Sequence, residues 1–139
     1  MRWRRGAIVA LCALGLAACE DAAIGYRIAG MNHALVLERQ QPFPWSEVKQ
    51  AVVVSRLPQC QRKYPIAPDR AEMTPMKVYE AGDLLWALEQ GDHWYLASTE
   101  DCRLQPWDKP DPQALGTLVG TFRHRDGVLV FESALNPAS

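Results

Sequence analysis

The chain has no apolar run long enough to cross a bilayer as a helix. Its longest uncharged apolar stretch, residues 7–18, is about half of the roughly 20 residues that a transmembrane helix needs. Glu20 and Asp21 follow almost immediately. A permanent helical anchor is therefore disfavoured.

Motifs that carry chemistry are also missing. After residue 18 there is no Gly-rich phosphate loop, no metal-binding helix, no Gly-x-Ser-x-Gly nucleophile elbow and no paired-cysteine motif. His33, His93 and His124 are scattered, and no spacing selects Ser98 or Ser133 as a nucleophile. The sequence thus predicts no catalytic, cofactor-binding or metal-binding residue, and an enzyme is the less favoured interpretation.

Positive charge is scarce outside the N-terminus. Arg2, Arg4 and Arg5 lie within residues 1–18, so residues 19–139 hold 12 basic and 16 acidic residues, a formal charge of −4. Because nucleic-acid binders are normally basic, we expect no nucleic-acid partner.

The N-terminal segment itself is built like an export signal. Three arginines precede the apolar run of residues 7–18, and small residues precede Cys19. On these features alone, an ordinary cleaved signal followed by a chance cysteine stays open beside a lipoprotein signal.

Leu16-Ala17-Ala18-Cys19 resembles the lipobox of bacterial lipoproteins, and this resemblance covers about the first 19 residues. It implies cleavage before Cys19, a diacylglycerol thioether on Cys19 and acylation of the new amino terminus. Several acyl chains, each burying about 0.8 kcal/mol per methylene, would hold such a protein on a membrane. Inner and outer membrane both stay open, because the sorting rule for acidic pairs such as Glu20-Asp21 differs among bacteria.

Two internal segments are similar to parts of short uncharacterised lipoproteins of proteobacteria. They are Leu57-Pro58-Gln59-Cys60-Gln61-Arg62 and Trp94-Tyr95-Leu96-Ala97. The similarity implies a cell-envelope location, facing the periplasm or the cell exterior, and no reaction. The Ser-Gly-x-x-Tyr signature of the small lysozyme-inhibitor lipoproteins is absent.

Cysteine usage then predicts one disulfide. Cys12 lies in the segment to be removed and Cys19 is the lipid acceptor, which leaves Cys60 and Cys102. An even pair in an oxidising compartment indicates a disulfide. A zinc site that adds His93 and His124 is disfavoured, because no two of these residues have ligand spacing.

The remaining pattern is that of a small, mainly β protein. Strand-forming runs occupy residues 33–39, 48–56, 93–98, 117–124 and 128–133, and apolar residues alternate within residues 76–88. Arg125-Asp126-Gly127 is a strong hairpin signal. We expect a signal peptide (1–18), a tether (19–32) and one β-rich domain (33–139), an antiparallel meander of about seven strands closed as a barrel or sandwich.

Two proline-rich stretches, residues 57–75 and 106–112, predict irregular loops. A Cys60–Cys102 disulfide would pin them together and form a candidate partner-binding surface. Arg62 and Lys63 would supply charge and Trp107 an apolar anchor, unless these charges simply belong to a solvated loop. Trp45, also between prolines, is a further candidate for an exposed anchor, whereas Trp86 is expected in the core.

Together these features predict a lipid-anchored cell-envelope protein that is a non-enzymatic interaction or assembly module. The partners would be the membrane, through lipid on Cys19, and an envelope protein whose identity the sequence does not give. The alternative is an inhibitor or capturing module for a soluble envelope protein or ligand.

Overall fold

The structure is a computed structural model that describes residues 19–134, so the predicted signal peptide of residues 1–18 lies outside the described residues. The described chain forms ten strands and one short 3₁₀-helix. In chain order they are β1 (Asp21–Ala29), β2 (His33–Gln40), β3 (Val48–Arg56), β4 (Cys60–Asp69), β5 (Met76–Gly82), β6 (Leu85–Gln90), β7 (His93–Ser98), β8 (Arg103–Pro106), η1 (Pro112–Ala114), β9 (Leu118–Arg125) and β10 (Val128–Ser133).

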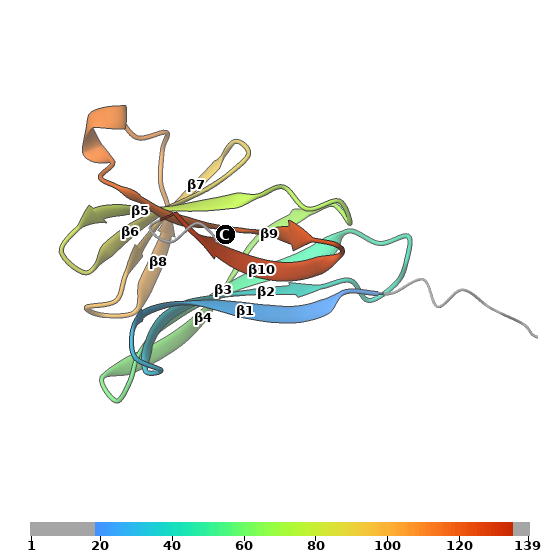
Figure 1. Cartoon of the computed structure of the whole chain (residues 1–139), viewed down its shortest axis with the longest axis horizontal. Coiled ribbons are helices and arrows are strands. Elements are labelled where there is room, and N and C mark those ends of the chain that lie inside the picture. The colour runs from blue at the N-terminus through green and yellow to red at the C-terminus, as the bar shows by residue number, and fades with distance from the viewer. Residues whose placement is uncertain (1–18, 135–139) are drawn as a thin grey trace, which may run out of the picture.

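The strands build two antiparallel sheets that pack face to face as a sandwich (Figure 1). Sheet A has the order β1-β2-β3-β4, a simple meander. Sheet B has the order β10-β9-β5-β6-β7-β8, so β9 returns across the sheet to pair with β5. The prediction of a mainly β, antiparallel fold is confirmed, and the sheets form a sandwich with no closed barrel in the described part of the chain.

The core lies between the two inner faces. Sheet A contributes Leu35 and Leu37 from β2 with Val52 and Val54 from β3, all at most 2% exposed. Sheet B contributes a larger set, which includes the predicted core residue Trp86: Met76, Val78, Trp86, Leu88, Tyr95, Ala97, Val119, Phe122 and Leu129. Along most strands every second side chain points into this layer, whereas in β9 both Val119 and Phe122 face it because the β5–β9 pairing shifts register there.

Several predicted strands and turns are confirmed within a residue or two. β2 and β3 occupy the runs expected from their Val and Leu content, and residues 41–47 connect them. β9 and β10 form the expected hairpin, where Asp126 (φ 50°) and Gly127 (φ 76°) both adopt the left-handed conformation. Two consecutive positive φ angles match the twist of the flanking strands, which is why an Asp-Gly step is favoured there.

The expected tether is wrong for most of its length. Residues 21–29 form β1, an edge strand of sheet A that pairs with β2 along its whole length. The cause is an alternating apolar face, since four residues of β1 pack against the core: Ala22, Ile24, Tyr26 and Ile28. The folded domain therefore begins two residues after Cys19 and not near His33.

The expectation that residues 57–75 form an irregular loop is also wrong. Most of this stretch is β4, in which Pro65 pairs with Ala51 and Pro68 lies near the end of the strand. β4 is the outer strand of sheet A, so the missing proline N–H groups interrupt no second ladder. Together with β1 and the short β8, β4 raises the count from the expected seven strands to ten.

The predicted Cys60–Cys102 disulfide is confirmed, and it joins the two sheets. Cys60 at the start of β4 is bonded to Cys102 in the turn between β7 and β8, with the two Cα atoms 5.9 Å apart. The Tyr64 hydroxyl donates a 2.6 Å hydrogen bond to the carbonyl of Cys102, beside the bridge. Closing a loop with a sequence separation of 42 residues constrains the unfolded chain by about 4 kcal/mol in the chain-entropy model.

Gly120 in β9 is required by the close approach of β10. A Cβ atom there would collide with the ring of Phe131 and the carbonyl oxygen of Glu132. We predict that Gly120→Ala lowers the free energy of unfolding by about 1–3 kcal/mol through overpacking, measured by urea unfolding followed by tryptophan fluorescence. The control is Gly25→Ala in β1, where the new Cβ would meet Val36 at 3.4 Å, an ordinary contact. Equal losses in both variants would contradict this account.

Candidate functional site

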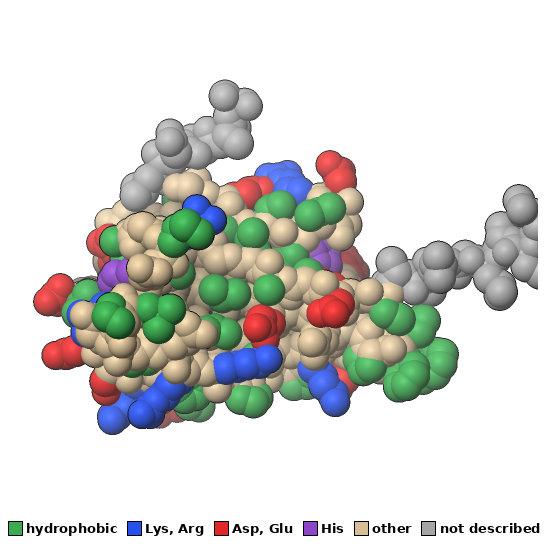
Figure 2. All heavy atoms as spheres, turned by 90° about the horizontal axis from the view of Figure 1, so that it is seen from below, with side chains coloured by type: hydrophobic (Ala, Val, Ile, Leu, Met, Phe, Trp, Pro, Cys, Tyr) green, Lys and Arg blue, Asp and Glu red, His purple; other side chains and the backbone are tan. Residues whose placement is uncertain are grey.

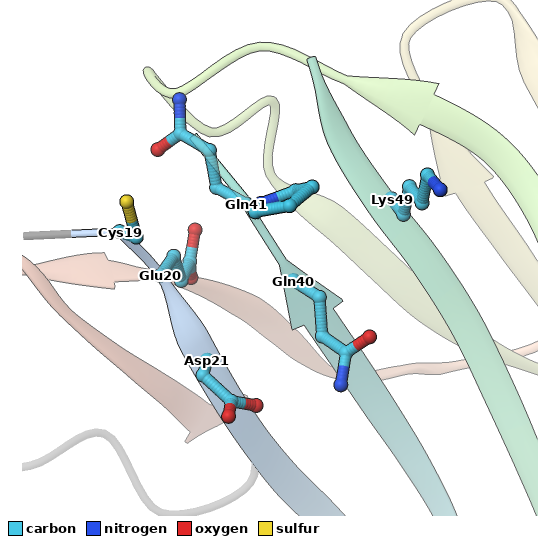
Figure 3. Close-up of a pocket in the computed structure, with 7 residues that line it drawn as sticks. Cys19, Glu20, Asp21, Gln40, Gln41 and Lys49 are labelled. Carbon is cyan, nitrogen blue, oxygen red and sulfur yellow. The ribbon is translucent and has the colours of Figure 1, made fainter. Parts of the chain in front are cut away.

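Cys19, the predicted lipid acceptor, lies exposed at one end of the sandwich with a free thiol. Only Glu20 separates it from β1. Figure 3 shows Cys19 and Glu20 at the start of β1 beside Gln41, where they line a hollow of about 380 Å³ with Asp21, Gln40, Pro42 and Lys49. A group attached to the Cys19 sulfur would therefore leave the domain at this end.

Glu20 is held in place from three sides. Arg39 Nε lies 3.0 Å from both carboxylate oxygens, and His124 Nε2 lies 2.7 Å from Oε1. The Gln41 N–H also donates a 2.7 Å hydrogen bond to the Glu20 carbonyl. The residue after Cys19 is thus fixed to β2 of sheet A and to β9 of sheet B.

Arg39 is the centre of a buried polar network, and its side chain is 0% exposed. Its Nη1 donates to Gln50 Oε1 and Asp69 Oδ2, both at 2.8 Å, and its Nη2 donates to the Arg70 carbonyl at 3.0 Å. All three guanidinium nitrogens therefore have partners, as a buried cation requires.

The network crosses from one sheet to the other through two glutamines. The Gln50 amide in β3 donates to Gln90 Oε1 in β6 at 2.8 Å, and the Gln90 amide donates to the Thr74 carbonyl at 2.9 Å. Gln50 and Gln90 are both buried. These residues fix the alignment of the sheets at the end that carries Cys19.

Asp69 stays ionised within this network. Burial alone raises its pKa, but hydrogen bonds from the Thr74 and Arg70 backbones and the Arg39 and Thr74 side chains outweigh burial. The net result is a pKa below the usual 3.8. The aspartate therefore pairs with Arg39 as a carboxylate.

A compact loop with an exposed aromatic pair lies beside Cys19. Residues 41–47 connect β2 to β3, and Phe43 and Trp45 are 54% and 82% exposed. Their rings stack with centroids 5.2 Å apart and an interplanar angle of 12°. Trp45 is therefore available as an exposed aromatic anchor, the role for which its position in the loop makes it a candidate.

Hydrogen bonds hold this loop in shape. Ser46 N–H and Oγ both donate to the Phe43 carbonyl, at 3.0 and 2.8 Å, and the buried Gln41 amide donates to the Pro44 and Ser46 carbonyls. The aromatic pair is thus presented by an ordered turn.

The structure does not bring Arg62, Lys63 and Trp107 onto one surface. Arg62 and Lys63 are consecutive residues of β4, so their side chains point to opposite faces of the sheet. Lys63 Nζ pairs with Glu38 at 2.5 Å on the outer face. Trp107 is half-buried and follows β8 at the end away from Cys102. Its backbone N–H donates a hydrogen bond to the Trp94 carbonyl there.

The buried network was missed at the sequence level, although one signal pointed to it. Arg39 lies in register with Leu35 and Leu37, the inward positions of β2, so the alternation alone places a cation inside the core. Its direct partners come from three other segments of the chain, at Glu20, at Gln50 and at residues 69–70, and no local pattern identifies them.

Residues 19–134 contain no group of three or more His, Cys, Asp or Glu side chains placed to hold a metal ion. None of the helices in this range has the length and apolar character to span a membrane. No protein-family model, curated protein or solved structure matches the chain.

Removal of the central cation is expected to destabilise the fold. We predict that Arg39→Met lowers the free energy of unfolding by about 3–5 kcal/mol, because Glu20 and Asp69 are left buried without their partner. The control is Arg103→Met, which breaks an exposed pair with Asp101 and is expected to cost at most about 1 kcal/mol. Urea unfolding measures both, and similar small losses would show that the network is not a structural centre.

The lowered pKa of Asp69 predicts an acid-sensitive stability. A carboxylate whose pKa is lower in the folded state contributes stability above its unfolded value of 3.8, and this contribution is lost as the pH falls through the folded pKa. The urea midpoint should therefore fall on acidification below pH 4, and Asp69→Asn should show a shallower fall from a lower starting midpoint. Asp101→Asn, at an exposed position, serves as the control and should keep the wild-type slope. An unchanged slope in Asp69→Asn would contradict the assignment.

Proposed function

We propose that this chain is a lipid-anchored protein of the bacterial cell envelope, with its β-sandwich facing the periplasm or the cell exterior as a non-enzymatic interaction module. The observation that carries the proposal is the position of Cys19. The last residue of the lipobox-like segment is exposed, and only Glu20 separates it from the first strand.

This position suits a lipid attachment point. A diacylglycerol thioether at the Cys19 sulfur would extend from the end of the sandwich without displacing any core side chain, because the thiol is exposed. Several acyl chains would each contribute about 0.8 kcal/mol per buried methylene, enough to hold the domain on the bilayer.

The polar network supports a structural role for the buried charges. Arg39 has no exposed surface, and its nitrogens are all engaged by protein groups. Asp69 and Gln50 both contact this cation, Asp69 also accepts hydrogen bonds from Thr74, and the Gln50 amide donates to the Ala67 carbonyl. These groups are therefore used to join the sheets, which favours a binding scaffold over a reaction centre.

The end opposite Cys19 suits an envelope protein partner. Met31, in the turn between β1 and β2, is 80% exposed, and Leu57, after β3, is 43% exposed. The Leu57 N–H donates to the Asn32 carbonyl at 2.8 Å, so the two turns are neighbours. An apolar patch that points away from the lipid is accessible to a protein in the adjacent space.

The proposal predicts acylation of Cys19. Mass spectrometry of protein extracted from bacterial membranes should show a chain that begins at an acylated Cys19. Cys19→Ser should abolish cleavage and acylation at this site, so that the lipid-anchored protein is lost from the membrane fraction. Cys12→Ser is the matched control, since residue 12 lies in the segment that cleavage removes and its substitution should leave the product unchanged. A mature chain that begins elsewhere would overturn the proposal.

A further inference from the structure

The exposed apolar side chains of the described residues gather at the end that carries Cys19. Of five large exposed hydrophobic residues, three lie there: Phe43, Trp45 and Val128. Val128 starts β10 and lines a hollow with Cys19, and the loop of residues 41–47 borders Cys19 through Gln41 and Pro42. Figure 2 shows hydrophobic side chains grouped at the right-hand end, where the described chain begins.

We propose that the loop of residues 41–47 inserts Phe43 and Trp45 into the membrane interface, so that the domain rests on the bilayer through an aromatic contact beside its lipid. This inference rests on the proposed lipid anchor at Cys19. It adds a second, non-covalent membrane contact and sets the orientation of the domain.

The chemistry of the pair fits the headgroup region of a bilayer. Tryptophan is enriched at membrane interfaces, where its apolar ring is buried and its N–H stays hydrated. Phe43 and Trp45 leave most of their surface in water in the isolated domain, so insertion removes apolar area that the fold does not cover.

The order of the loop reduces the cost of insertion. The hydrogen bonds of Ser46 and Gln41 fix the turn, and Pro42 and Pro44 restrict its backbone. Little conformational entropy is then lost when the rings enter the interface.

The short link to the lipid sets the geometry. Glu20, the single residue between Cys19 and β1, is clamped by Arg39 and His124. The domain therefore has little freedom to swing away from the bilayer. The loop beside Cys19 is held near the membrane interface, where the lipid on Cys19 enters the bilayer.

Charge near the loop favours an apolar contact over an electrostatic one. Lys49 and Arg125 lie at this end together with Asp21, Glu47 and Asp126, so the signs are mixed. Zwitterionic lipid should be sufficient, and added salt should have little effect.

Fluorescence quenching by brominated lipid tests the contact. The mature protein, purified from membranes and checked for acylation of Cys19 by mass spectrometry, is reconstituted in phosphatidylcholine vesicles with and without bromine on the upper acyl carbons. We expect quenching in the wild type and in Trp107→Phe, and loss of most of this quenching in Trp45→Phe. Acrylamide in the aqueous phase should quench Trp45 less in vesicles than in detergent-free denatured protein.

A reporter at the other end of the sandwich provides the matched control. Met31→Trp in the Trp45→Phe protein places an indole at a position about as exposed as Trp45, at 80% against 82%, but at the far end from Cys19. Bromine should leave this indole unquenched.

The outcomes separate the two proposals. If the protein is acylated but bromine does not quench Trp45, the aromatic contact is overturned and the lipid anchor is not. This holds whether acrylamide reaches Trp45 or a second copy or another protein shields it. Equal bromine quenching of Trp45 and of the residue 31 reporter overturns the orientation. A chain that carries no lipid overturns the proposed anchor and the inference with it.

Discussion

The buried guanidinium of Arg39 is the constraint on which the rest of the structure depends. A cation without exposed surface must be neutralised and fully hydrogen-bonded. Its partners Glu20, Gln50 and Asp69 come from the start of β1, from β3 and from the end of β4, so the cation holds together the strands of sheet A at one end. Gln50 passes the connection to Gln90 in sheet B. The disulfide performs the corresponding task at the other end, between Cys60 and Cys102.

The Arg39 network and the disulfide hold the ends of the sandwich by a different kind of interaction from the one that holds its middle. The middle of the molecule is held by apolar contacts between the inner faces, which are strong but have no direction. The ends are held by directional or covalent bonds, which fix how the sheets align. The end with Cys19 is thereby rigid up to the residue before the first strand, and this rigidity gives the proposed membrane contact a defined orientation.

Much of the fold could be predicted from local sequence because its hairpins are local. The β2, β3, β9 and β10 runs and the Asp126-Gly127 turn follow from alternation and turn chemistry. The sequence does not predict β1, because Gly25 and Gly30 mask the alternation of Ile24, Tyr26 and Ile28. The sequence does not predict β4 either. Proline is excluded from a central strand but is tolerated in an edge strand, and whether a strand lies at the edge depends on the whole topology. The Arg39 network was missed for the same reason, since its members are up to 104 residues apart in sequence.

The position of Cys19 at the head of β1 also has a mechanical consequence. β1 runs from the Cys19 end to the turn that carries Met31, and its hydrogen bonds to β2 lie perpendicular to this axis. A tension between a membrane at one end and a bound protein at the other therefore acts along the strand. Such a tension loads the β1–β2 hydrogen bonds in shear, so that many bonds bear the force together. A pull at right angles to the strand would instead break these bonds one after another.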